Sequence, residues 1–348
     1  MEKLHAEKIS AWMNGKLIGN PKASADKAGT DTRTLEKGSL FFAIKGERFD
    51  GHQFINTAFE KGASIVVSEK SFQTPSGCAV ILVDDPVKAL GDMARSYLKA
   101  FRIPVVGITG SVGKTTTKDM IAQILSTQYR VHKTMGNLNN HIGLPLSVLK
   151  LTRDHTAAVF EMGMSGMGEI EYLSRIIEPD IGVVTNIGIS HIEKLGSRQN
   201  ILRAKLEICK GMGKDGKLIL NGDDELLSGL EGLLSMPIIF YGINDNISLH
   251  AFGIESMGEE GVKFTVGLRG EDVEVRIRVP GIHNVSNALA AIACGLELGI
   301  TNENIRKGLA GYSQEKMRLN IRQFNGIKVI DDAYNAAPAS VTAALSVL

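Results

Sequence analysis

An apolar strand, a glycine-rich turn and a helix follow one another between residues 103 and 125. The run from Ile103 to Ile108 predicts a buried strand, and apolar residues at 120, 121, 124 and 125 predict an amphipathic helix. Gly110 and Gly113 lie in the turn, and Lys114 follows directly. Glycine lets the backbone approach an anion closely, and a helix N-terminus offers free N–H groups and a positive dipole end. This order of elements predicts a loop that binds nucleotide phosphates.

The residues expected to contact the nucleotide belong to this turn and to the helix start. They are Thr109, Gly110, Ser111, Val112, Gly113, Lys114, Thr115 and Thr116. Lys114 would reach the outer phosphates, and the Thr115 hydroxyl would bind a metal ion. The general pattern G-x-x-x-x-G-K requires glycine at position 108, where this chain has Ile108. A glycine-rich turn with an incidental lysine is the alternative, and the loop alone does not say what is done with the phosphates.

The composition is that of an ordinary globular protein of two to three domains. The 348 residues are 43% hydrophobic and 22% charged, and the formal net charge of +1 does not favour nucleic acid or an anionic membrane as partner. Three cysteines, far apart and without a C-x-x-C pair, are typical of a reducing compartment. The first residues lack the apolar core of a signal peptide, and no apolar run approaches the ~18 residues of a membrane helix. We therefore expect a cytoplasmic protein, and a monomer.

Strands and helices alternate along most of the chain, which predicts an α/β fold. Residues 1–84 predict a small α/β domain. The strands expected next lie at 103–108, 157–160, 181–184, 218–220 and 238–240. With the helical segments between them, these strands predict a mostly parallel sheet with helices on both faces. Residues 247–280 alternate apolar and polar side chains, which predicts an antiparallel excursion.

Polar residues of unusual type follow two of the expected central strands. Glu161 follows the strand at 157–160, and His191 lies in the loop after the strand at 181–184. In open α/β sheets, ligands bind outside the carboxyl ends of the strands. Glu161 therefore fits a Mg²⁺ ligand beside Thr115, since Mg²⁺ prefers oxygen. Taken alone, however, His191 is more readily explained as a hydrogen-bonding loop histidine, and Lys205 as a solvent-facing helix residue.

The loop and the segments after it resemble those of the Mur ligases, which build the peptide of the bacterial cell-wall precursor; folylpolyglutamate synthase is a relative. The family's loop has the glycine spacing found at 107, 110 and 113, which accounts for Ile108. Further matches follow in chain order at Glu161-Met162-Gly163, at His191, at 204–207, at 221–224 and at 281–288. The resemblance therefore covers nearly the whole chain.

The resemblance implies an ATP-dependent ligase with two Mg²⁺ sites. Thr115 and Glu161 would hold the metal that bridges the β- and γ-phosphates, while His191 and a carbamylated Lys205 would hold the second metal. Lys114, Lys205 and His191 would then be the catalytic residues. Additional nucleotide contacts are implied for Asn284, Asn287, Arg318 and Asp332.

The resemblance also implies the substrates. Asp31-Thr32-Arg33 and Asp50-Gly51-His52 resemble the family's UDP-sugar-binding domain, so Thr32, Arg33, Asp50 and His52 are expected substrate contacts. The segment 136–145, with Asn137, Asn139 and Asn140, resembles the ligase of the last step, as do residues 331–338. That ligase joins D-Ala-D-Ala to UDP-N-acetylmuramoyl-tripeptide through an acyl phosphate.

Three domains follow from the resemblance: a UDP-sugar-binding domain at 1–84, a central ATP-binding domain at 85–314, and the beginning of a Rossmann-like ligase domain at 315–348. The last domain is expected to be incomplete in this chain. Two alternatives stay open. One is another ligase of the family, acting on a single amino acid or on folate; the other is a nucleotide-binding switch, which would have no use for a UDP-sugar domain.

Overall fold

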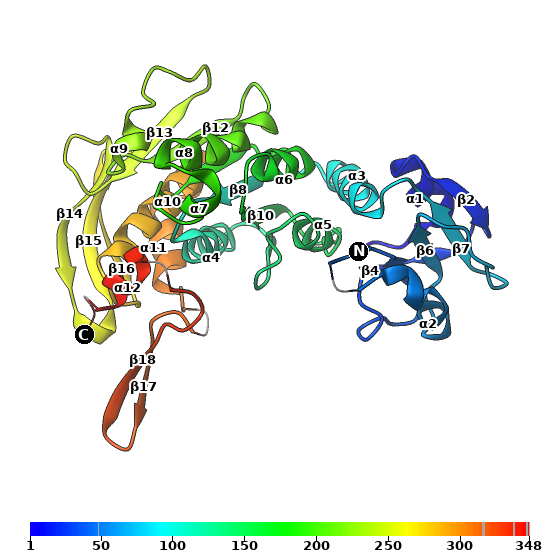
Figure 1. Ribbon diagram of the computed structural model, residues 1–348. Helices are drawn as coiled ribbons and strands as arrows, with labels where there is room; N and C mark the ends of the chain where they lie inside the picture. The colour runs from blue at the N-terminus through cyan, green and yellow to red at the C-terminus, as the bar shows by residue number, and fades with distance from the viewer. Residues whose placement is uncertain (48, 315–316, 337, 346, 348) are drawn as a thin grey trace. The chain divides into compact units, whose positions relative to one another are not determined.

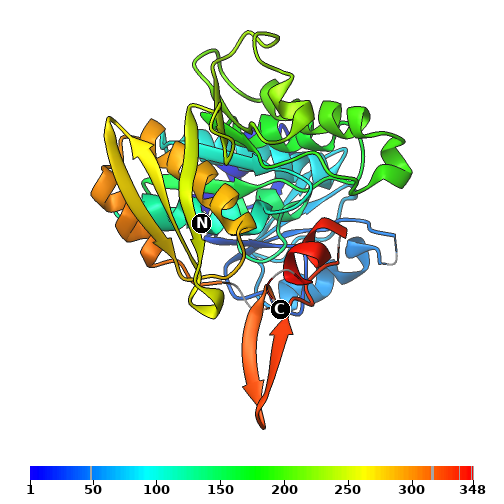
Figure 2. The same cartoon turned by 90° about the vertical axis from the view of Figure 1, so that its left-hand side faces the viewer.

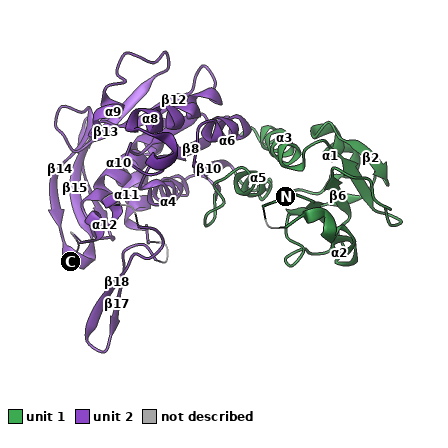
Figure 3. Ribbon diagram, viewed as in Figure 1, with its two compact units in different colours: residues 1–102, 134–155 green, residues 103–133, 156–348 purple. Residues whose placement is uncertain are grey.

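The computed structural model describes residues 1–47, 49–314, 317–336, 338–345 and 347. The chain forms two compact units, coloured separately in Figure 3. Unit 1 comprises Met1–Arg102 and Thr134–His155, and unit 2 comprises Ile103–Lys133 and Thr156–Leu348. The chain therefore passes from one unit to the other after residues 102, 133 and 155.

These units do not follow the ranges 1–84, 85–314 and 315–348. Pro86, which follows the expected boundary at residue 84, begins helix α3, Pro86–Lys99, and this helix belongs to unit 1. The Asp85 carboxylate accepts hydrogen bonds from the N–H groups of Val87 and Lys88 at 2.8 and 3.0 Å, as a helix N-cap does. The division into three domains stays a prediction that rests on the resemblance to the family.

Unit 1 contains a five-stranded sheet in the order β2-β7-β6-β5-β4, in which only β2 is antiparallel to its neighbour. Its elements are β1 Leu4–His5, α1 Ala6–Trp12, β2 Lys16–Gly19, β3 Ser24–Ala25, β4 Lys27–Gly29, β5 Ser39–Phe42, η1 Gly51–Phe54, α2 Ile55–Glu60, β6 Ile65–Ser68, β7 Ala79–Leu82, α3, and α5 Gly143–Val148. Strands β5, β6 and β7 are apolar and buried almost throughout, because helices and loops cover both faces of a sheet of this kind. Phe41, Val66 and Val80 form a core with Ile55 and Ala58 of α2.

Unit 2 is built on a nine-stranded sheet in the order β16-β15-β14-β13-β12-β11-β8-β10-β9. Its strands are β8 Val105–Thr109, β9 Val131–Lys133, β10 Ala157–Glu161, β11 Ile181–Val184, β12 Lys217–Asn221, β13 Ile238–Gly242, β14 Leu249–Ser256, β15 Val262–Leu268 and β16 Glu271–Ile277. Its helices are α4 Lys114–Leu125, α6 Glu169–Ile177, α7 Ile192–Leu195, α8 Arg198–Leu206, η2 Glu207–Lys210, α9 Glu225–Ser228, η3 Gly258–Glu260, α10 His283–Glu297 and α11 Asn302–Ala310.

The strands from β9 to β14 are parallel, and β14, β15 and β16 are antiparallel, as the sequence predicted. After β8 the chain adds β10 and β9 on one side of it, and then β11 and β12 on the other side. Strand order thus reverses at β8. Such a switch point leaves a crevice at the carboxyl ends of the strands, and the phosphate-binding loop begins there.

Helices cover both faces of the parallel part of this sheet (Figure 1). Helices α4 and α10 pack on one face and share a continuous apolar core with the strands, and α11 packs on α4 and on β16. Helix α6 contacts β8 on the other face, and α8 packs on α6. At Gly107, in the middle of β8, an added Cβ would lie 2.9 Å from Met162 and 3.1 Å from Ile177. Glycine therefore lets α6 pack closely against the central strand.

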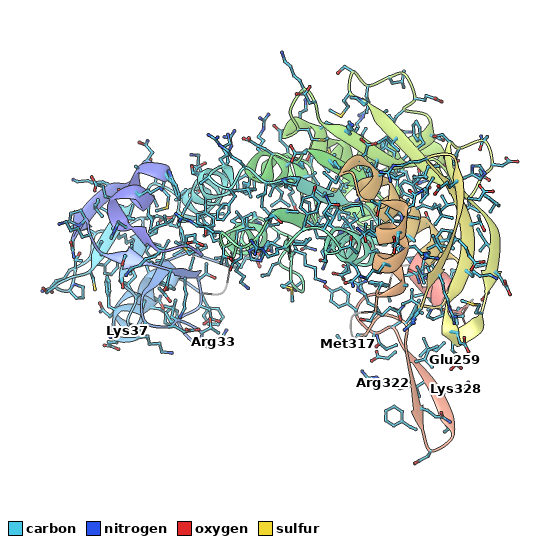
Figure 4. All side chains as sticks on the ribbon, turned by 180° about the vertical axis from the view of Figure 1, so that it is seen from behind. Arg33, Lys37, Glu259, Met317, Arg322 and Lys328 are labelled. Atoms are coloured by element: carbon cyan, nitrogen blue, oxygen red, sulfur yellow. The ribbon has the colours of Figure 1, made fainter. Side chains whose placement is uncertain are left out.

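The last part of unit 2 is a hairpin, β17 Asn320–Phe324 and β18 Ile327–Asp331, followed by α12 Pro338–Leu345. Figure 2 shows the hairpin projecting from the rest of the unit. An ion pair joins Lys328 of the hairpin to Glu259 of the turn before β15, and both side chains are labelled in Figure 4. Within the matched segment 331–338, Ala337 lies outside the described residues. None of the helices in the described part of the chain combines the length and the apolar character needed to cross a lipid bilayer.

Candidate active site

Hydrogen bonds join the loop between β8 and α4 to the segment after β11. Val112 makes two of them: the Val112 N–H donates to Asn186 Oδ1 at 3.1 Å, and the Val112 carbonyl accepts from Thr185 Oγ1 at 2.6 Å. Gly188 N–H donates to Ser111 Oγ at 2.9 Å. Because Thr185 and Asn186 directly follow β11, these bonds attach the loop to the end of the neighbouring strand. Gly110 is required here, since an added Cβ would lie 1.8 Å from Thr185 Oγ1.

Replacing Gly113 by alanine is expected to weaken nucleotide binding about tenfold and to destabilise the fold. Gly113 caps α4 with φ 82°, and a Cβ there would lie 2.6 Å from Asn287 Oδ1. The backbone strain alone costs about 1–2 kcal/mol. Gly299→Ala is the matched control, because Gly299 has φ 75° and nothing within 4 Å of an added Cβ. Urea unfolding should show a lower free energy of unfolding for both variants. The dissociation constant of ADP should rise only for Gly113→Ala. Equal ADP affinity in the two variants would contradict the steric argument.

Lys114 lies folded against its own loop. Its ammonium donates to the carbonyls of Gly110 and Ser111, at 2.8 and 3.3 Å. Burial lowers the pKa of Lys114, the nearby Arg318 charge lowers it further, and Glu161 opposes both. An ammonium held over a phosphate-binding loop neutralises phosphate charge when a nucleotide is bound.

Thr115 connects the loop to two charged groups. Its hydroxyl donates to Glu161 Oε2 at 2.9 Å and accepts from Arg318 Nη2 at 3.0 Å. Glu161 is the last residue of β10 and is only 3% exposed, so its carboxylate is fixed beside the loop. The Arg318 guanidinium also lies over the Tyr334 ring, 4.3 Å from its centroid. The structure thus joins Thr115, Glu161 and Arg318 in one hydrogen-bonded group.

Lys205 is a buried lysine of α8, with 2% of its surface exposed. Burial, with a further contribution from the Lys114 charge, lowers the pKa of Lys205 to about 7. Partial burial and the ammonium groups of Lys205 and Lys114 lower the pKa of His191 as well, while Glu169 opposes this shift. The three predicted catalytic residues therefore lie close enough to influence one another's charge. The alternative of a solvent-facing Lys205 is wrong.

His191 itself is an exposed residue that caps α7 in the left-handed region, with φ 63°. A histidine is uncommon in that conformation, and residues held this way occur often at functional sites. Because His191 is exposed, its imidazole is accessible to a ligand at the edge of the sheet. No local sequence pattern predicts its left-handed backbone.

Glu207 is a residue of this region for which the sequence suggested no role. Its buried carboxylate accepts hydrogen bonds from the N–H groups of Gly168, at 2.7 Å, and Glu171, at 3.2 Å, at the start of α6. A carboxylate at a helix N-terminus is stabilised by the free N–H groups and the dipole there. Glu207 thereby fixes the end of the helix that carries Lys205 against the loop that follows Glu161.

Beside the loop lies a cavity of about 290 Å³. Of the predicted nucleotide contacts, it is lined by Val112, Gly113, Thr116, Asn284, Asn287, Arg318 and Asp332. The two asparagines are joined, Asn287 Nδ2 donating to Asn284 Oδ1 at 3.0 Å, and Asn287 Oδ1 accepts from Thr117 Oγ1 at 3.2 Å. The remaining lining residues are Thr185, Asn186, Asn221, His283, Ser286, Gln314, Leu319, Ser340 and Ala343. A polar cavity next to a phosphate-binding loop can hold the base and ribose of a nucleotide.

Asp332 contributes to this cavity in two ways. Its carboxylate accepts a hydrogen bond from the Leu319 N–H at 3.1 Å, which fixes the start of the hairpin. Its charge also acts on His283, whose pKa is lowered mainly by burial. His283 is a lining residue that sequence reasoning missed, although it stands next to Asn284.

The expected UDP-sugar contacts lie together in unit 1. The Asp31 carboxylate accepts hydrogen bonds from the guanidinium and from the backbone N–H of Arg33, and this pairing lowers the pKa of Asp31 to about 2. The Arg33 side chain is 87% exposed, and Figure 4 labels it at the surface of unit 1. Thr32 is the residue between them. The pair therefore presents a positioned guanidinium that an anionic ligand can reach.

His52 is buried, and both of its ring nitrogens are in use. The Glu69 N–H donates to Nε2 at 3.3 Å, so in the neutral ring the proton lies on Nδ1, which is 2.6 Å from Asp50 Oδ1. Asp50 also accepts from the His52 N–H at 3.0 Å. In this geometry His52 orients the Asp50 carboxylate. Of these two expected contacts, Asp50 is the more accessible to a ligand.

The three expected asparagine contacts lie in the loop before α5, also in unit 1. Asn140 Oδ1 accepts from Ile142 and Gly143, at 3.2 and 2.8 Å, and so caps the turn that leads into the helix. Asn137 and Asn140 are exposed and Asn139 is half-buried. All the expected nucleotide contacts, by contrast, belong to unit 2.

Oxygen ligands for Mg²⁺ are present next to the loop. Thr115 Oγ1 and Glu161 Oε2 lie 2.9 Å apart, and a hydroxyl with a carboxylate is a donor set that Mg²⁺ accepts. Lys205 and His191 offer nitrogen, which Mg²⁺ disfavours, so Lys205 fits a metal only as a carbamate with oxygen atoms. Across the residues that the structure describes, no three His, Cys, Asp or Glu side chains gather as a ready-made metal cage.

Comparison with known proteins places these observations in a family. The model of the Mur ligase middle domain matches residues 108–295, and that of the Mur ligase family catalytic domain matches residues 27–98. The UDP-N-acetylmuramoyl-tripeptide--D-alanyl-D-alanine ligase of Bacillus subtilis is 49% identical over 318 residues, which are 91% of this chain and 68% of that protein.

Two solved structures have a similar fold. MurF from Acinetobacter baumannii is 34% identical, with a TM-score of 0.94 over 100% of this chain and 77% of its own. MurF from Thermotoga maritima, in complex with ADP, is 30% identical, with a TM-score of 0.83 over 92% of this chain and 74% of its own. Fold and site together define an α/β protein with a phosphate-binding loop at the switch point of its central sheet. The chain belongs to the Mur ligase family.

Proposed function

We propose that this protein is an ATP-dependent ligase that joins D-Ala-D-Ala to UDP-N-acetylmuramoyl-tripeptide in peptidoglycan precursor synthesis. The observation that carries the proposal is the group formed by Lys114, Thr115, Glu161 and Arg318 at the loop, with Lys205 and His191 beside it. The names of the B. subtilis and A. baumannii relatives support this choice among the ligases of the family.

The reaction has two steps. The γ-phosphoryl group of ATP passes to the terminal carboxylate of the tripeptide, which gives an acyl phosphate and ADP. The amine of D-Ala-D-Ala then attacks the acyl carbon, phosphate leaves, and the amine loses a proton as the amide forms. Phosphoryl transfer depends on positioning and charge neutralisation rather than on a covalent protein intermediate. Such chemistry needs an arrangement of fixed cations and N–H groups, and the loop of unit 2 offers one.

Each residue of the group has a task in this scheme. When the nucleotide binds, the Lys114 ammonium donates to β- and γ-phosphate oxygens in place of the loop carbonyls. Arg318 adds a second cation next to Thr115. Asn284, Asn287 and Asp332 hold the nucleotide in the adjoining cavity. Arg33 and Asp50 of unit 1 bind the UDP end of the acceptor. The cytoplasmic location and the monomeric state expected from the sequence stay predictions.

Mg²⁺ would be held by Thr115 and Glu161 and, at a second site, by His191 and carbamylated Lys205. It supplies charge neutralisation for the phosphates when it is bound. Lys205 is suited to the modification because its lowered pKa leaves much of the amine neutral near pH 7. The neutral amine adds to CO2 and loses a proton, so that a buried cation becomes an anion.

The proposal is tested by incubating the full-length protein with ATP, Mg²⁺ and UDP-N-acetylmuramoyl-tripeptide. ADP release is expected to require D-Ala-D-Ala and to be absent with single amino acids. Release that depends on a single amino acid, or on folate with glutamate, would assign the protein to another ligase of the family. ATP hydrolysis with no acceptor dependence would support a nucleotide-driven switch instead.

A further inference from the structure

Residues 186–188, which follow β11, contact the phosphate-binding loop through alternate residues. The Asn186 carbonyl accepts a hydrogen bond from the Ser111 N–H at 3.2 Å, and the Gly188 N–H donates to Ser111 Oγ at 2.9 Å. The residue between them, Ile187, is 1% exposed, and its N–H and carbonyl bind side chains that lie outside the loop. The segment thus connects the loop to a second set of side chains.

Asp224 binds this segment with one carboxylate oxygen and caps a helix with the other. Its Oδ2 atom accepts from the Ile187 N–H at 2.7 Å. Its Oδ1 atom accepts from the N–H groups of Leu226 and Leu227, at 3.0 and 3.3 Å, and so caps α9. The Ile187 N–H is therefore held at a fixed place relative to the start of α9.

Arg198, the first residue of α8, holds the carbonyl of the same residue. Its Nε and Nη2 atoms both donate to the Ile187 carbonyl, at 3.1 and 3.0 Å, and its Nη1 atom donates to the Glu225 carboxylate. Hydrogen bonds with a charged donor or a charged acceptor are stronger than those between neutral groups. Two charged side chains, Arg198 and Asp224, thus fix the residue that stands between the two contacts with Ser111.

Packing alone does not fix the segment against the loop. Both border a cavity of about 280 Å³, whose lining includes Ser111, Val112, Asp224 and residues 186–190. Protein interiors are otherwise close-packed, and a group with empty space on one side loses the dispersion energy of the missing contacts. The separation between segment and loop therefore depends on the hydrogen bonds just described.

We propose that Arg198 and Asp224 are positioning residues for nucleotide binding, which act through Ile187 to hold Asn186 and Gly188 against the phosphate-binding loop. The inference rests on the proposed function, of which it concerns the nucleotide step. The N–H groups of the loop bind phosphate well only when they are held in one arrangement, so a shift of the supporting segment weakens the binding of ADP and ATP. Neither Arg198 nor Asp224 has to touch the nucleotide for this effect.

Asp224→Asn tests the inference with a nearly isosteric change. The amide keeps one oxygen, which two N–H groups hold at the start of α9, and turns its NH₂ group toward the Ile187 N–H. The dissociation constant of ADP with Mg²⁺, measured by calorimetry on the full-length protein, is expected to rise about tenfold. Asp85→Asn is the matched control, because one Asp85 oxygen caps α3 in the same way and Asp85 lies in unit 1. The ADP affinity of Asp85→Asn should equal that of wild type.

Arg198→Met is the second variant, and it changes the charge in the opposite direction. Loss of a cation by itself weakens the binding of an anion, and loss of a carboxylate by itself strengthens it. A loss of ADP affinity of about tenfold in both Arg198→Met and Asp224→Asn therefore reports the position of Ile187 and not the charge. Glu225→Gln keeps the two bonds from Arg198 to Ile187 and should leave ADP affinity unchanged.

Unchanged ADP affinity in Asp224→Asn would overturn the inference, and so would tighter binding in Asp224→Asn with weaker binding in Arg198→Met, or an equal loss in Asp85→Asn. If Asp224→Asn does not fold, an unchanged ADP affinity in Arg198→Met overturns it alone. In turnover, KM for ATP should rise about tenfold while KM for UDP-N-acetylmuramoyl-tripeptide stays within about twofold, and an equal rise in both would refute the role. If the wild-type protein turns over no acceptor, the proposed function fails, and the ADP affinities still decide whether the two residues position the loop.

Discussion

Lys114→Met is expected to lower kcat/KM for ATP-dependent ligation by about 10²–10³-fold. Methionine keeps the length and the apolar stem of lysine but removes the charge. The ammonium lies 2.8 Å from the Gly110 carbonyl and close to Thr115, Glu161 and Arg318, so it is already placed where phosphate charge is expected. A charge fixed in a partly buried site acts more strongly on a transferring phosphoryl group than the same charge in water.

Two further measurements separate this electrostatic role from a loss of structure. Lys307→Met removes an exposed lysine from α11 of the same unit and should leave the rate unchanged. The Lys114 charge also contributes to the lowered pKa of Lys205, so Lys114→Met should shift the pKa of Lys205 upward. Near-normal turnover in Lys114→Met would contradict the role proposed for the loop.

The loop could be predicted from the sequence because its signal is local. Strand, glycine turn and helix follow one another within about twenty residues, and the helix period and the Gly-Lys-Thr order are visible without knowledge of any other segment. Glu161 was found for a related reason: a polar residue at the end of an apolar strand lies at the ligand-binding edge of a parallel sheet. The structure places Glu161 next to Thr115, as that argument requires.

Three features of the structure could not be predicted from the sequence, because they depend on contacts between residues far apart in the chain. Glu207 bonds the start of α6, 36 to 39 residues away, and nothing in its own neighbourhood signals that role. The burial of Lys205 is a second case, since its helical pattern alone favoured a solvent-facing side chain. The membership of residues 134–155 in unit 1 is a third, because it follows from the packing of α5 against α3 and from the hydrogen bond that Tyr97 of α3 donates to the Leu151 carbonyl. Local patterns carry no information about such partners.

Lys205→Met is expected to reduce ligation by about 10²–10³-fold while making the unliganded protein more stable at neutral pH. Lysine is costly at this position because it is 2% exposed, and burial lowers its pKa to about 7 from an ordinary value of 10.5. This gap corresponds to roughly 5 kcal/mol that folding loses at pH values below about 7, where the buried amine must carry its proton. Methionine fills a similar volume without that cost.

The free energy of unfolding depends on pH because the pKa of Lys205 is about 7 in the folded chain and 10.5 in the unfolded chain. Between pH of about 7 and 10.5 the unfolded chain binds a proton at Lys205 that the folded chain does not, so the free energy of unfolding rises with pH across this window. In bicarbonate-free buffer, the Tm advantage of Lys205→Met over wild type should therefore be largest near pH 6.5 and should disappear toward pH 10. Wild-type ligation with bicarbonate present should fall as pH drops below about 7, because only the neutral amine forms a carbamate. A Lys205→Met enzyme with normal turnover would exclude the carbamate, and a Tm difference independent of pH would show that Lys205 does not titrate within this window.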